Sequence, residues 1–255
     1  MYSVKDPQTT AAEPTFTLLI FTLNEIEGCK TILPQVDRSL FTQILVVDAG
    51  STDGTPAWCR EQGFEVYTQN RTGLRNAYLE VLPHVKSDYL IAFSPDGNSL
   101  AEKLPELVEK LKEGYDMVIV SRYLDGAKSD DDDVVTAFGN WMFTRLVNRL
   151  HRGRYTDVMV MYRGLRTSLM RDLRLDDPDE RLTKWTGKIF FATMGNEPLM
   201  SARASRAGYK VAEIAGDEPP RIGGKAKLKV FRWGAATLAQ FLLEVFIPPG
   251  RYRSR

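Results

Sequence analysis

The chain has 255 residues, of which 43% are hydrophobic and 26% charged, an ordinary composition for one large α/β domain or two small ones. The 34 basic and 33 acidic side chains nearly cancel, so we expect no nucleic acid partner, and an anionic ligand would need a local basic patch. Residues 1–14 lack the apolar core of a signal peptide, and no run of about 18 uncharged apolar residues could span a membrane.

The two cysteines, Cys29 and Cys59, lack the pattern of a disulfide framework and the spacing of metal ligands. Both lie in predicted helices, so we expect reduced thiols in the core. Reduced thiols are typical of a cytoplasmic setting, which we predict for this protein.

Short apolar runs alternate with helical stretches over the first 123 residues. We predict strands at 15–23, 44–47, 64–68, 88–93 and 116–120, and helices at 27–33, 57–62, 73–85 and 104–113. This β-α alternation is typical of a mostly parallel sheet covered by helices on both faces.

Each predicted strand is followed by polar side chains. They are Asn24 and Glu25, then Asp48, Ser51 and Asp53, then Asn70 and Arg71, then Asp96 and Asn98, and finally Arg122. Because the carboxyl ends of parallel strands share one edge, these five groups should face one crevice. Capping of the next helix is the alternative for the turn at 51–53, but capping alone does not explain all five groups.

The second half is less regular. We predict a solvated acidic loop at 126–133, a helix at 134–152, an apolar strand at 158–162, a mobile lid loop at 172–195, a helix at 197–207, an edge strand at 209–214, a Gly- and base-rich loop at 219–227 and an amphipathic helix at 228–246. The consecutive aspartates 130–133 lack the spacing of a metal cage.

The apolar face of the last helix has two interpretations. It packs on the domain or on a second copy in a homodimer, which we favour. Alternatively, it lies on the inner face of a membrane, with its Trp at headgroup level and the basic tail near anionic lipid.

In this order the motifs resemble glycosyltransferase family two, and within it the dolichyl-phosphate mannose synthase-like branch. The similar segments are Thr22 to Glu25, Val47 to Thr55, Gly73 to Ala77, Asp96, Val120 to Tyr123, and Tyr209 to Leu228. The resemblance implies a GT-A (Rossmann-like) α/β fold over 15–228, with a nucleotide-sugar-binding half at 15–123 and an acceptor-binding half at 124–228. A flexible segment 1–14 precedes it, and an amphipathic helix with a basic tail, 229–255, follows.

The resemblance also implies how the donor, a nucleotide diphosphate sugar, is bound. The implied donor-binding residues are Leu23, Asn24, Glu25, Asp48, Ser51, Asp53, Gly73, Arg75, Ser94, Asp96, Lys225 and Lys227. Asp48 and Glu25 would hydrogen-bond the base and ribose. Ser94 stands where the family has the first Asp of its metal motif, so Asp96 and Asn98 would hold Mg²⁺ or Mn²⁺ with help from water and phosphate oxygens, at reduced affinity.

The acceptor determines the remaining chemistry. The predicted catalytic residues are Asp96, Arg122, Asp157 and Glu197. A polyprenyl phosphate needs cations and no base, a role that suits Arg122, Arg145 and Arg149. A hydroxyl acceptor needs a general base, for which Asp157 and Glu197 are candidates.

Each of these residues also has a purely structural interpretation. Asp157 would anchor an arginine, Glu197 would begin its helix, and Arg145 and Arg149 would be solvated.

We therefore predict an inverting, metal-assisted glycosyltransferase that uses a polyprenyl phosphate acceptor. One alternative is transfer to a hydroxyl on a glycan, a lipid or another macromolecule. Another, motivated by Ser94, is a protein that binds nucleotide sugar without turnover.

Overall fold

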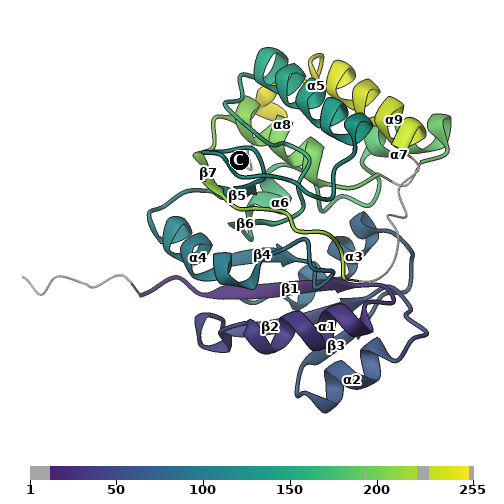
Figure 1. The fold of residues 1–255 in the computed structure, drawn as a ribbon. Helices are drawn as coiled ribbons and strands as arrows, with labels where there is room; N and C mark the ends of the chain where they lie inside the picture. The colour runs from purple at the N-terminus through teal and green to yellow at the C-terminus, as the bar shows by residue number, and fades with distance from the viewer. Residues whose placement is uncertain (1–11, 193, 223–229, 253–255) are drawn as a thin grey trace, which may run out of the picture.

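The structure is a computed structural model that describes residues 12–192, 194–222 and 230–252 (Figure 1). The described residues form a seven-stranded sheet in the order β3-β2-β1-β4-β6-β5-β7. The strands are β1 (Phe16–Thr22), β2 (Gln43–Asp48), β3 (Glu65–Thr68), β4 (Tyr89–Phe93), β5 (Met117–Ser121), β6 (Arg163–Arg166) and β7 (Val211–Ala215). All paired strands are parallel except β6, which is antiparallel to β4 and β5. The predicted mostly parallel α/β sheet is therefore confirmed.

Helices cover both faces of this sheet. They are α1 (Ile26–Ile32), α2 (Thr55–Glu61), α3 (Leu74–Val81), α4 (Leu104–Lys112), α5 (Val134–His151), α6 (Leu169–Asp172), α7 (Arg181–Phe190), α8 (Glu197–Ala207) and α9 (Val230–Glu244). Short 3-10 helices occupy Leu33–Gln35, Arg38–Leu40, Leu82–His84, Ala101–Lys103 and Pro249–Arg251. No helix in the described ranges is long and apolar enough to cross a bilayer.

Successive side chains of β1 point to opposite faces of the sheet and enter two separate cores. Leu18 and Ile20 pack with α1, α2 and α4, whereas Leu19 and Phe21 pack with α3 and α8. The strand ends lie level, because Thr22 pairs with Asp48 in the parallel register of β1 and β2. Level ends bring the loops that follow β1, β2 and β4 to one edge.

Helices α5, α7 and α9 form an outer layer beyond α8 (Figure 1). The rings of Phe143 and Phe241 meet at 5.9 Å, and His151 Nε2 lies 3.0 Å from the carbonyl of Phe241. Gly234 also lies against Phe143, so α5 and α9 run in the same direction. Gln240 near the end of α9 donates to Thr183 near the start of α7, so α7 runs in the opposite direction.

Two predictions for the second half are wrong. The strand forms at Arg163–Arg166 and not at 158–162, which is a buried connection of bends. The reason is that Arg163 turns its guanidinium back onto the carbonyls of Val158 and Val160, which fixes them outside any ladder. The predicted lid loop at 172–195 contains α7, because Glu180 caps Thr183 N at 2.7 Å and a face including Leu182 is buried.

The C-terminal helix packs on the domain through part of its apolar face, whereas Phe231, Leu242 and Phe246 of that face are exposed. Phe241 and Gln240 of α9 are fully buried. Its end is fixed by Arg203 of α8, which pairs with Glu180 at 2.8 Å and with Glu244 at 3.2 Å. These buried pairs join the start of α7, the middle of α8 and the end of α9.

Gly28 of α1 should be intolerant of any side chain. A Cβ there would lie 2.1 Å from the carbonyl oxygen of Pro95, in the loop that follows β4, whereas a Cβ on Gly139 of α5 would meet nothing within 4 Å. We expect Gly28→Ala to lower the free energy of unfolding in urea by about 2–4 kcal/mol. Gly139→Ala, the matched control, should be neutral or stabilising; equal effects of the two substitutions would contradict this close contact.

Candidate functional site

The loops after β1 and β2 are joined by hydrogen bonds among the predicted donor-binding residues. Asn24 has a left-handed backbone (φ 54°), and its Oδ1 accepts from Thr52 N at 2.8 Å. Ser51 Oγ accepts from Asn24 N at 2.8 Å, and Asp53 accepts from Ile26 N at 3.0 Å. These side chains fix the shape of the crevice wall.

Asp48 is almost completely buried and organises its own turn. Its carboxylate accepts from Thr22 Oγ1 at 3.1 Å, from Gly50 N at 2.9 Å, and from the backbone N and the hydroxyl of Ser51. Gly50 adopts φ 89°, a conformation that favours glycine. In this structure the carboxylate therefore shapes the wall of the crevice, and contact with a nucleotide remains a prediction.

Asp96 follows β4 and is held by the segment after β7. Its Oδ2 forms an ion pair with Arg221 Nη1 at 2.9 Å, and its carbonyl accepts from Ile222 N at 2.7 Å. Between Asp96 and Asn98, Gly97 has φ 95° and lies directly under the Ile222 side chain. The close backbone approach brings the guanidinium of Arg221 to the carboxyl edge of the sheet.

The acidic run closes over this pair. We predicted a solvated loop here, but two of its carboxylates bond to residues of the site. Asp131 Oδ2 accepts from Asn98 Nδ2 at 3.0 Å and from Arg221 Nε at 3.1 Å. Asp132 accepts from the hydroxyl of Tyr123, and Asp133 caps α5 together with Thr136. The run therefore contributes one carboxylate to the crevice and one to a helix cap.

Arg122 is the most heavily paired cation of the site. Its Nε and Nη2 donate to Asp157 at 2.6 and 3.2 Å, and its Nη1 donates to Glu218 at 2.9 Å. Burial alone would lower the pKa of Arg122, but Asp157 and then Glu218 hold it well above its ordinary value. Burial would likewise raise the pKa of Asp157, but Arg122 holds it below its ordinary value.

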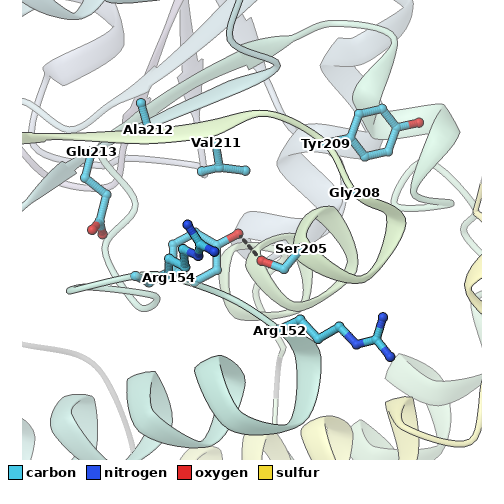
Figure 2. A pocket seen from close by; sticks show the side chains of 9 residues that line it. Arg152, Arg154, Ser205, Gly208, Tyr209, Val211, Ala212 and Glu213 are labelled. Atoms are coloured by element: carbon cyan, nitrogen blue, oxygen red, sulfur yellow. Dashed lines mark hydrogen bonds between the residues drawn. The ribbon is translucent and has the colours of Figure 1, made fainter.

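Asp157 is itself positioned by β7. Its backbone N donates to Glu213 Oε1 at 3.0 Å, and Thr156 N donates to Oε2 at 2.7 Å. On the other side of Glu213 lies a hollow of about 520 Å³. Figure 2 shows Glu213 and Ser205 on two sides of this hollow, with Arg154 between them. No predicted site residue is among the residues that line it.

Arg75 and Glu197 both lie near the start of α8. Arg75 is the second residue of α3, after the N-cap Gly73, which has φ 102°, and it donates to Asn196 Oδ1 at 2.7 Å and to the carbonyl of Asp177 at 2.6 Å. Glu197 is buried, and burial raises its pKa although the nearby Arg163 opposes the shift. Both side chains lie inside the protein in this structure.

The remaining predicted site residues are dispersed. Arg145 and Arg149 are exposed on α5, where Arg145 stacks over the Trp141 ring at 4.5 Å. No interaction among the described residues links either arginine to Arg122. Leu23, Glu25 and Ser94 are half-buried at the strand ends. Lys225 and Lys227 lie outside the described residues.

The comparison with protein families decides the identity. The model described as glycosyl transferase family 2 matches residues 17–174, which include Asp48, Asp96, Arg122 and Asp157 but not the segment after β7. The chain belongs to glycosyltransferase family 2.

The curated relatives of this glycosyltransferase confirm the predicted branch. The dolichyl-phosphate hexose transferase of Haloferax volcanii is 26% identical, over 84% of this chain and 87% of its own. The polyprenol monophosphomannose synthase of Mycolicibacterium smegmatis is 28% identical, over 90% of this chain and 91% of its own. Glycosyltransferase AglJ of Haloferax volcanii is 29% identical over 81% of this chain, which spans only 64% of AglJ.

A solved structure shares the fold of this glycosyltransferase. Glucosyl-3-phosphoglycerate synthase from Mycobacterium tuberculosis, in complex with Mn²⁺, uridine diphosphate and phosphoglyceric acid, superposes with a TM-score of 0.64. The identity is 19%, over 93% of this chain and 80% of that chain. The predicted GT-A fold is thereby confirmed.

The oxygen atoms near Asp96 suit a metal ion whose coordination shell is completed by the substrate. Asn98 Oδ1 is buried and has no hydrogen-bond partner among the described residues, and the Asp96 carboxylate lies two residues away. No group of three or more His, Cys, Asp or Glu side chains within the described ranges is placed to hold an ion. Oxygen ligands of this kind fit Mg²⁺ or Mn²⁺ only if water and phosphate supply the other positions.

Sequence reasoning missed three residues of the site. Arg221, Glu218 and Asp131 all contact predicted residues, yet Arg221 lies 90 positions from Asp131 along the chain. A signal existed for Arg221, because it occupies the Arg of the family-like Arg-x-x-Gly segment within 209–228. No local pattern marks Asp131 or Glu218.

The stability of this glycosyltransferase should depend on pH through Glu197. Because the native pKa is raised above the ordinary 4.5, ionisation of Glu197 favours the unfolded chain, and its cost appears as the pH rises from about 4.5 through the native value. We expect the advantage of Glu197→Gln over the wild type to be absent at pH 4 or below and to grow towards pH 8, measured by urea unfolding. Exposed Glu61→Gln serves as control. An advantage that shrinks with rising pH would mean that Arg163 holds Glu197 ionised.

Proposed function

We propose that this glycosyltransferase moves a sugar, with inversion, from a nucleotide diphosphate sugar to a polyprenyl phosphate. The observation that carries the proposal is the bidentate pairing of Arg122 with Asp157 at the carboxyl edge of the sheet. The pairing keeps a guanidinium charged in the crevice, and it engages both oxygens of one candidate base. The second candidate base, Glu197, is buried next to Arg163.

This arrangement favours an acceptor that is already anionic. A hydroxyl must lose its proton to a positioned base as the bond to the sugar forms. A phosphate monoester needs no such base, only cations that hold it in line with the anomeric carbon. The names of the relatives from Haloferax volcanii and Mycolicibacterium smegmatis refer to dolichyl and polyprenol phosphates, which supports the same acceptor.

Arg221 is the residue we assign to the departing diphosphate. In this structure its guanidinium bridges Asp96 and Asp131, so a diphosphate entering here would replace Asp131 as its partner. A cation fixed beside the leaving group stabilises the charge that develops there. A divalent ion held by Asp96 and Asn98 would neutralise further charge on the same diphosphate.

Replacement of Asp96 tests the donor site. We expect Asp96→Asn to reduce transfer by about 100-fold or more, since one fixed electrostatic contact to a leaving group has that weight. Transfer of labelled sugar to a short prenyl phosphate in micelles, with Mg²⁺ or Mn²⁺, measures it. Exposed Asp179→Asn, whose carboxylate pairs with Lys184 alone among the described residues, should leave transfer unchanged. Full activity of Asp96→Asn would remove Asp96 from the donor site.

Replacement of Arg122 tests the acceptor. Arg122→Lys keeps the charge but loses the two-pronged geometry, so we expect KM for the prenyl phosphate to rise at least about tenfold, with a smaller change for the donor. Arg166→Lys is the matched control, since Arg166 pairs with Asp116 at the opposite edge of the sheet. Thermal melting checks that both variants are folded. An unchanged KM for the phosphate, with transfer to sugar hydroxyls instead, would favour the hydroxyl acceptor.

A further inference from the structure

Exposed apolar side chains gather on the outer helical layer. Of the twelve large hydrophobic side chains that are exposed among the described residues, eleven lie in α5, α7 or α9 or within two residues of their ends. Exposed apolar side chains gathered on one layer of a folded protein mark an interaction site. The core-facing sides of the same helices are well packed, so this exposure is additional to a complete core.

Most of these side chains share one end of the layer. The starts of α5 and α9 and the later part of α7 come together there, because α5 and α9 are parallel and α7 is antiparallel to them (Figure 1). We call this surface the helix-end patch, and it comprises Val134, Phe138, Trp141, Phe191 and Phe231, together with Trp185 from the middle of α7. Val134, Phe191 and Phe231 are 86%, 81% and 85% exposed. Phe138 and Trp141 stack at 5.6 Å between ring centroids.

The layer that carries the patch is strongly basic. Helices α5, α7 and α9 contain six Lys or Arg residues and one acidic residue, Glu244, which is buried against Arg203. The rest of the chain is left with 28 basic and 32 acidic side chains. Arg145 stacks on Trp141 at the patch itself. The charges of the protein are therefore segregated, and the helical layer is the positive side.

We propose that the helix-end patch docks the enzyme on the surface of an anionic lipid bilayer. Exposed Trp and Phe beside Lys and Arg are suited to the headgroup region, where amphipathic rings insert and cations meet anionic lipid. A second copy of the chain fits less well, because a two-fold contact through the patch would bring its basic side chains against themselves.

The position of the patch next to the crevice deepens the proposed function, on which this inference rests. Helix α5 begins directly after the acidic run, and α9 follows the segment that begins at Ile222 beside Asp96. Within the acidic run, Asp131 and Asp132 bond inward to Arg221 and Tyr123, and Asp133 caps α5, whereas Asp130 is exposed without a side-chain partner among the described residues. A prenyl phosphate in the bilayer would present its headgroup at the mouth of the site.

Vesicle binding by the purified full chain tests docking without any sugar donor. We expect co-sedimentation with vesicles of phosphatidylcholine and phosphatidylglycerol, little with phosphatidylcholine alone, and loss of binding in high salt. Lys188→Glu with Arg232→Glu should weaken binding at least roughly tenfold, given the contribution of each basic side chain near anionic lipid; both side chains are exposed, and Arg232 follows Phe231 at the start of α9. Trp141→Ser with Trp185→Ser should also weaken it. The matched control is Phe246→Ser, which is 82% exposed at the other end of α9.

Three outcomes would overturn the inference. They are no vesicle binding, binding that the Phe246→Ser control loses as strongly as the patch variants do, and a dimer in solution that Trp141→Ser with Trp185→Ser dissociates. Transfer to a short prenyl phosphate in micelles separates this inference from the proposed function. The patch variants should retain that activity, whereas a protein that binds vesicles but never transfers to a prenyl phosphate would refute the proposed acceptor and leave docking intact.

Discussion

The site depends on the guanidinium of Arg122, which lies between carboxylates from two distant segments. Asp157 comes from the turn before β6, and Glu218 comes from the segment after β7. A buried charge is very costly without partners, and the removal of one partner leaves the other uncompensated. The pairing therefore fixes three segments at once: the end of β5, the turn at 157 and the strand-like segment at 218. This part of the crevice has its shape because these charges must meet.

The site carries more negative than positive groups. Asp96, Asp131, Asp157 and Glu218 converge on only two guanidiniums, those of Arg122 and Arg221. Burial raises the pKa of Glu218, although Arg122 opposes the shift, so burial makes the ionisation of this carboxylate costly. An excess of carboxylate is unfavourable alone but suits a site that binds a cation together with a phosphate-bearing substrate.

The first half of the fold follows closely from local sequence, because each strand there is a short apolar run that ends in polar residues. Asp96 and Arg122 could be placed at one edge on that basis alone. The second half could not, because its decisive contacts are non-local. Strand β6 contains Arg163, a fully buried arginine, and a charged residue at that position is not typical of a buried strand. Charged residues around Arg181 likewise obscure the apolar pattern of α7 in the sequence. Asp131 and Glu218 carry no local signature, since their roles arise only when residues about 90 positions apart meet.

The buried pairing of Arg203 with Glu180 and Glu244 has a consequence for how the chain reaches its folded state. Glu244 lies near the end of the described chain, and Tyr252 donates to it as well. Arg203 therefore cannot be neutralised on both sides until the C-terminal segment has arrived, and contacts of such long sequence separation form late and slowly. A nascent chain still lacking this segment would hold α8 with a half-paired buried cation. Completion of the last helix is thus the step that gives Arg203 both of its partners and joins α7, α8 and α9.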